Sequence, residues 1–148
     1  MQTFLPYPDY QSSAQVLDRG RLGQQRNEVF VILNARLQDQ EGWQNVPWLR
    51  HPACLMWTGY EYQLALYGLE VCKEWQGRGY KDSVEDKILK LMPKFPVIDP
   101  TKPHWLGDPT FHTSHQSNLL RKFPEHYKML WPNVEPGLEY VWPASRFS

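Results

Sequence analysis

Apolar residues recur at helical spacing in the first third of the chain. Four of them share one stripe at 3.6 residues per turn, namely Leu22, Val29, Leu33 and Leu37. Ser12 and Ser13 are good N-cap residues, so we expect an amphipathic helix that begins there and runs to about Gln38.

A second helix is predicted over residues 52–76, because Pro52 suits a first helical position. Gly77 or Gly79 would end it. Its expected core face consists of Leu55, Tyr62, Leu66 and Leu69.

The rest of the chain predicts short helices and long connections. A short helix is expected over 83–91 and a last helical region over 114–130, interrupted near Pro124. Residues 92–111 read as a proline-rich loop, with prolines at 93, 96, 100, 103 and 109. No alternating strand pattern is present, so the sequence predicts an all-α, compact single domain over 1–148. It would have three to five helices and end in an irregular tail with Trp131, Pro132, Tyr140, Trp142 and Pro143.

Charge, cysteine content and the lack of long apolar runs limit the kinds of function and location that we expect. Sixteen basic and sixteen acidic residues give a net charge of zero, so any nucleic-acid contact must come from a local patch. Cys54 and Cys72 would lie on the same predicted helix about 27 Å apart, too far for a disulfide, which indicates free thiols in a reducing compartment. The start of the chain lacks a signal-peptide pattern and no apolar run is long enough for a membrane span, so a cytoplasmic location without a membrane partner is expected.

The first predicted helix carries charged groups at the border of its apolar face. Arg26 falls inside the apolar stripe, and Arg21, Gln25 and Glu28 lie beside it. Such an arrangement can orient a carboxylate, tune its pKa and grip phosphate. A buried structural ion pair of Arg26 with Asp18 or Glu28 explains the pattern equally well.

The amino terminus is a second candidate group. Methionine followed by the large residue Gln2 is expected to be retained, so the free α-amine would belong to Met1. An unperturbed α-amine titrates near ~7.7–8, which leaves part of it as an unprotonated nucleophile at neutral pH.

Histidines and polar residues cluster in the last third. His104, His112 and His115 suggest a metal site, but their spacing fixes no third ligand, and hydrogen-bonding or phosphate-contacting histidines are favoured. Phosphates and base edges would suit the donors of the last helical region, which are His115, Gln116, Asn118, Arg121 and Lys122. A solvated amphipathic helix is the alternative interpretation.

Three segments, in this order, resemble the pyrimidine-dimer DNA glycosylase family typified by the phage repair enzyme endonuclease V. The first is Asp18, Leu22 and Glu28 at the spacing of the family's first long helix. The second is the glycine-aromatic run 75–80. The third is the polar run 114–122 with Pro124, Tyr127 and Lys128 behind it, so the resemblance spans about residues 1–130.

The resemblance implies a compact all-α fold and a DNA glycosylase that uses no cofactor or metal. In that family an N-terminal α-amine attacks C1′ of the damaged nucleoside, displaces the base and forms a Schiff base, and strand cleavage at the abasic site can follow. Glu28 matches the family's glutamate, while Gln2 stands where the family has its threonine nucleophile, which leaves Met1 as the nucleophile. The expected DNA contacts are Arg21, Gln25, Arg26, His115, Gln116, Asn118, Arg121, Lys122, Tyr127 and Lys128.

Two other functions fit parts of the pattern. One is a non-catalytic nucleic-acid or nucleotide-binding module of the same fold, suggested by the neutral charge and the altered N-terminus. The other is a metal-dependent hydrolase built on His104, His112 and His115.

Overall fold

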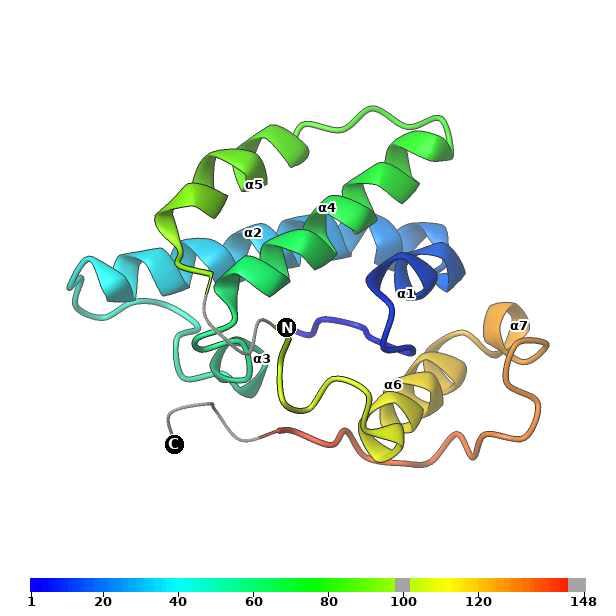
Figure 1. Ribbon diagram of the computed structural model, residues 1–148. Helices are drawn as coiled ribbons and strands as arrows, with labels where there is room; N and C mark the ends of the chain where they lie inside the picture. The colour runs from blue at the N-terminus through cyan, green and yellow to red at the C-terminus, as the bar shows by residue number, and fades with distance from the viewer. Residues whose placement is uncertain (98–101, 144–148) are drawn as a thin grey trace.

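A computed structural model describes residues 1–97 and 102–143, which fold into helices without a strand (Figure 1). The all-α prediction is confirmed, although the described residues hold seven α-helices instead of three to five. The elements are α1 Tyr10–Val16, α2 Arg19–Gln40, α3 Pro52–Leu55, α4 Glu61–Gly77, α5 Glu85–Leu91, the 3-10 turn η1 Met92–Lys94, α6 Pro109–Lys122 and α7 Pro124–Tyr127. None of these helices is long and apolar enough to cross a membrane.

The first predicted helix is two helices, α1 and α2, separated by extended backbone at Leu17 and Asp18. Asp18 breaks the run because its carboxylate caps α2, accepting the Arg21 backbone N–H, and also accepts the Tyr127 hydroxyl at 2.6 Å. The predicted apolar stripe of α2 is confirmed as buried.

The second predicted helix is also divided, by a turn over residues 56–60 that contains Gly59 at φ +83°. Cys54 and Cys72 therefore lie on different helices, α3 and α4, and both are buried free thiols. The predicted core face was wrong: Leu55 is exposed and Tyr62, Leu66 and Leu69 are only partly buried. The buried residues of α4 are Gln63, Leu64, Ala65, Tyr67, Gly68, Val71 and Cys72.

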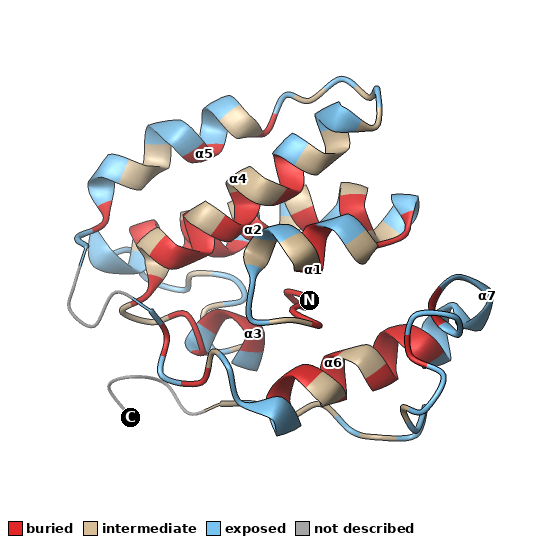
Figure 2. Ribbon diagram, turned by 45° about the vertical axis from the view of Figure 1, so that its right-hand side comes forward, coloured by how far each residue is buried: buried red, intermediate tan, exposed pale blue. Residues whose placement is uncertain are grey.

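Gly68 explains this choice of face. The helices α2 and α4 lie side by side, and buried residues gather where they meet (Figures 1 and 2). A Cβ atom at Gly68 would lie 2.6 Å from Val29 Cγ1 of α2 and 2.9 Å from Ile88 Cδ1 of α5. Only a glycine lets the three helices approach this closely.

Replacing Gly68 by alanine should therefore destabilise the protein. Alanine is the better helix former, but overpacking of a core costs about 1–3 kcal/mol, so we expect a net loss of stability in urea unfolding. Gly77→Ala on the same helix is the control, because its added Cβ would meet nothing within 4 Å. Equal stability of Gly68→Ala and the unchanged chain would contradict this account of the packing.

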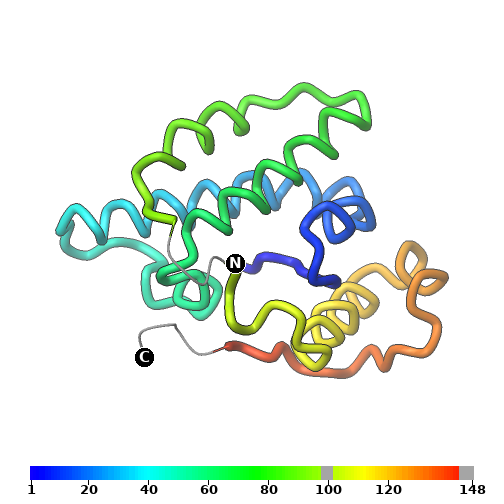
Figure 3. The backbone as a smooth tube through the Cα atoms, in the orientation of Figure 1, coloured from blue at the N-terminus to red at the C-terminus, as the bar shows by residue number. Residues whose placement is uncertain are grey.

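The first eight residues run as an extended segment between the α2–α4 pair and α6 (Figure 3). The last helical region begins at Pro109, five residues before the predicted Ser114, because Asp108 caps it through the Thr110 N–H at 3.0 Å. Its interruption at Pro124 is confirmed. In the proline-rich loop, residues 98–101 with Pro100 lie outside the described residues, as do 144–148 at the end of the tail.

Candidate active site

The amino-terminal segment is held by side chains from the helices on one of its sides. On α2, Gln25 accepts the Phe4 N–H with Oε1 at 2.9 Å and donates from Nε2 to the Gln2 carbonyl at 2.8 Å. On α4, Tyr67 donates its hydroxyl to the Phe4 carbonyl at 2.8 Å. These bonds satisfy backbone groups that the helices would otherwise bury unpaired.

The helix α6 holds the segment from its other side. His115 Nδ1 accepts the Leu5 N–H at 2.9 Å, and His112 Nδ1 donates to the Leu5 carbonyl at 2.8 Å. Gln116 donates to the Pro6 carbonyl at 2.8 Å. Residues 2–6 are thus bonded on both sides, which fixes where Met1 lies.

Several residues predicted to bind DNA are part of this scaffold. Gln25, His115, Asn118 and Tyr127 are at most 2% exposed and are all bonded within the protein. Direct contact with DNA would require these buried bonds to break. In this structure these four side chains are buried and bonded within the fold, and Gln116 is likewise bonded to the segment.

The arginines of α2 do not orient Glu28. Arg26 pairs with Asp82 at 2.5 Å and lies over the Trp75 ring at 4.3 Å. The interpretation of Arg26 as a structural ion pair is confirmed, but the partner is Asp82 and not Asp18 or Glu28. Arg21 pairs with Asp18 at 3.3 Å.

The remaining predicted DNA contacts lie at the end of α6 and beyond it. Arg121 is exposed, donates to the Pro136 carbonyl at 3.0 Å and also contacts Asn118. Lys122 and Lys128 are exposed, so their side chains are accessible to a phosphate. These two lysines stay predictions as backbone contacts.

The three histidines named for a metal site do not form one. His104 Nδ1 bonds the Tyr60 hydroxyl at 3.1 Å, and both ring nitrogens of His112 are used, by Leu5 and by the Gly107 N–H. Burial lowers the pKa of His115 to about 3, so its ring is neutral. No group of three His, Cys, Asp or Glu suited to a metal occurs in residues 1–97 and 102–143. The structure gives no support to the metal-dependent hydrolase.

The amino terminus interacts electrostatically with two side chains, Glu28 and His51, and we call these three groups the polar cluster. Burial raises the pKa of the partly buried Glu28 carboxyl, and the positive amino terminus offsets part of that rise. Burial lowers the pKa of His51, and the amino terminus lowers it further. The α-amine of Met1 therefore acts electrostatically on both side chains. None of the ion pairs among the described residues joins Met1 to Glu28.

His51 was not among the candidate residues named from the sequence, which places it in a loop. It caps α3, because its Nδ1 accepts the Ala53 N–H at 3.0 Å, so the neutral ring carries its proton on Nε2. The available signal was Pro52 at the first helical position, which makes His51 the N-cap.

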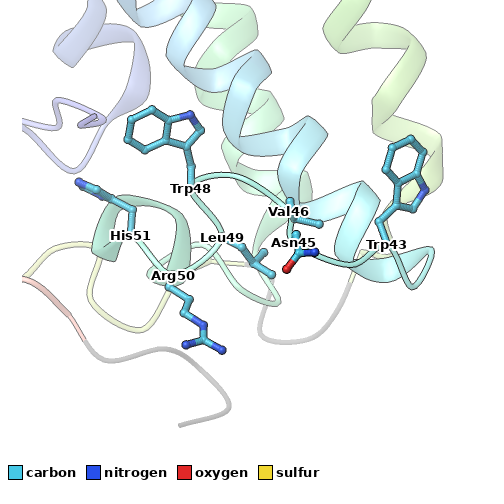
Figure 4. Close-up of a pocket in the computed structure, with 7 residues that line it drawn as sticks. All are labelled: Trp43, Asn45, Val46, Trp48, Leu49, Arg50 and His51. Atoms are coloured by element: carbon cyan, nitrogen blue, oxygen red, sulfur yellow. The ribbon is translucent and has the colours of Figure 1, made fainter.

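A hollow of about 670 Å³ lies beside His51, within the loop that connects α2 to α3 (Figure 4). Seven residues of this loop line it, and His51 stands at one end with Trp48 next to it. The seven are Trp43, Asn45, Val46, Trp48, Leu49, Arg50 and His51. The hollow therefore borders the polar cluster at His51.

Gln25→Leu should loosen the whole amino-terminal segment. The leucine side chain has about the volume of glutamine, but it leaves the Phe4 N–H and the Gln2 carbonyl buried without these partners. We therefore expect the free energy of unfolding to fall by about 2–4 kcal/mol. Gln24→Leu is the control, since Gln24 is exposed on the same helix. Similar stabilities of the two variants would contradict the role of Gln25.

Comparison with known proteins agrees with this architecture. A family model described as pyrimidine dimer DNA glycosylase matches residues 1–88, more than half of the 148 residues, and the match contains Met1, Glu28 and His51. The predicted resemblance is confirmed there, whereas its third segment, 114–128, lies outside the match. No curated protein and no solved structure matched the chain. The chain therefore belongs to the pyrimidine dimer DNA glycosylase family and is a DNA glycosylase, an enzyme that acts on DNA.

Proposed function

We propose that the α-amine of Met1 is the nucleophile of base removal and that Glu28 is its acid/base partner. The amine nitrogen would form a bond to C1′ while the glycosidic bond breaks, and the bonding pair would leave with the base, which takes up a proton. Loss of the amine proton and opening of the sugar ring give a Schiff base. Its hydrolysis frees the abasic site, or loss of a C2′ proton expels the 3′ phosphate and cuts the strand.

The observation that supports this proposal is the electrostatic interaction of the positive amino terminus with the Glu28 carboxyl, which form no direct ion pair among the described residues. A direct ion pair would engage the amine and leave it less available for attack on C1′. The raised pKa of Glu28 makes its carboxyl a better proton donor to the departing base near neutral pH. After it has given up this proton, the ionised carboxylate would stabilise the positive charge that develops on the sugar.

His51 supports the same chemistry. Its lowered pKa favours the neutral ring at pH 7, so His51 adds no second positive charge beside the amine that would disfavour the positive charge developing on the sugar. We assign the proton on Nε2 as a hydrogen-bond donor toward the substrate, and Lys122 and Lys128 as contacts to the DNA backbone.

Borohydride trapping tests the proposal. The chain beginning at Met1 should form a covalent adduct with duplex DNA that contains an abasic site, and it should release a base from damaged duplexes. The substrate series begins with pyrimidine dimers, which the family description names, and extends to other modified bases because of Gln2. Salt-dependent DNA binding with neither adduct nor base release would favour the non-catalytic binding module instead.

A further inference from the structure

Trp48 has a conformation that core packing does not explain. Its backbone is left-handed, at φ +67°, which strains a bulky residue, and its side chain is 57% exposed. A buried tryptophan would gain enough contact to hold such a backbone. The strain here presents an indole to solvent.

The indole lies next to the polar cluster. Its ring contacts the His51 ring, with centroids 6.4 Å apart and planes at 66°. Figure 4 shows both side chains on the same side of the loop. The amino terminus lies beside α3, which His51 caps, in both Figures 1 and 2, and Trp57 just after α3 donates to Thr3 Oγ1 at 3.1 Å.

Beneath Trp48, the surface of α2 is hollowed. A shallow depression of about 270 Å³ lies between Trp48 and Pro47 on one side and Val31 and Asn34 on the other. Val31 follows Glu28 by three residues, so the two side chains lie on the same face of α2. The depression thus continues from the face that carries Glu28.

The other exposed tryptophan of the loop is placed differently. Trp43 is 59% exposed, but it lies at the far end of the loop and its indole does not face Trp48 or His51 (Figure 4). It has no ring contact with His51 among those found for the described residues. Trp43 is therefore a matched control for exposure, size and loop.

We propose that Trp48 is the stacking platform for the nucleobase whose sugar faces Met1, with the Asn34 amide available to the edge of that base. This inference rests on the proposed function and adds the base-binding subsite. An exposed indole stacks on any base, and an amide side chain can donate to and accept from a base edge.

The first test measures binding and needs no chemistry. A duplex with one unpaired nucleotide is compared with the same duplex carrying an abasic site at that position. The protein should prefer the base-bearing duplex, and Trp48→Ala should remove this preference by weakening its binding about 5- to 150-fold, the range expected for loss of one base–aromatic stack. Trp48→Phe should retain most of the preference and Trp43→Ala all of it.

The second test separates Trp48 from the chemical step. Trp48→Ala should reduce trapping on abasic-site DNA much less than it weakens binding of the base-bearing duplex, because the abasic substrate has no base to stack. The proposal is overturned if the protein has no preference for the base-bearing duplex, if Trp43→Ala loses it equally, or if Trp48→Ala weakens binding to both duplexes alike. If the unchanged chain forms no adduct, the Met1 chemistry fails, while the binding comparison still decides the role of Trp48.

Discussion

One extra glycine ahead of Met1 should abolish covalent trapping on abasic-site DNA, with a rate loss on the order of 10³-fold or more. Residues 2–6 are bonded to α2, α4 and α6, so the segment cannot slide to compensate. The extension turns the Met1 nitrogen into an amide, which is not a nucleophile, and moves the new amine about 3.3–3.6 Å along the chain. Single-turnover borohydride trapping measures the loss.

Stability should not change with this extension, because the bonded part of the segment starts at Gln2 and Met1 itself is only partly buried. The control adds the same glycine after Ser148, where trapping should remain at its original rate. A chain extended ahead of Met1 that still traps at full rate would show that another amine performs the reaction.

Glu28→Gln should lower the rate of base release about 10²- to 10⁴-fold, the usual contribution of a positioned acid/base group. The fold should not suffer. Since burial raises the folded-state pKa of Glu28, its ionised form is disfavoured in the folded protein. The free-energy cost of ionising Glu28 in the folded protein is fully present above its folded-state pKa and vanishes below its unfolded-state pKa. Glu28→Gln should therefore be as stable as the unchanged chain at low pH and at least as stable at neutral pH.

Base release followed over pH 4–9, together with thermal unfolding over the same range, measures both effects. Glu41→Gln is the control, because Glu41 is exposed at the end of α2 and should affect neither. Full base release by Glu28→Gln would remove Glu28 from the mechanism. A large loss of stability at neutral pH would instead assign it a structural role.

Local pattern predicts the helices well and their ends less well. The buried stripe of α2 could be predicted because Leu22, Val29 and Leu33 recur at helical spacing within one short segment of the sequence. The break before α2 depends on Asp18, whose partner Tyr127 lies 109 residues away. The face of α4 depends on Gly68 meeting Val29 across two helices. Contacts at such separations leave no trace in the local pattern.

The candidate site shows the same contrast between features that are local in the sequence and features that depend on distant contacts. Glu28 was named from local features of its helix and from its match to the family's glutamate, and its catalytic role stays a prediction. Gln25 and His115 were assigned to DNA because the donors and acceptors that suit a phosphate or a base also suit the backbone of an extended segment. Arg26 needed a partner, but nothing nearby identified Asp82, which is 56 residues further along.

The most direct test of the account is to locate the trapped amine. No lysine precedes Lys73, so the tryptic peptide 1–19 contains the α-amine of Met1 as its only amine. After borohydride reduction on abasic-site DNA and digestion with nuclease and trypsin, mass spectrometry should find the sugar remnant on this peptide. A remnant on a lysine-containing peptide, or none on any peptide, would contradict the role of Met1.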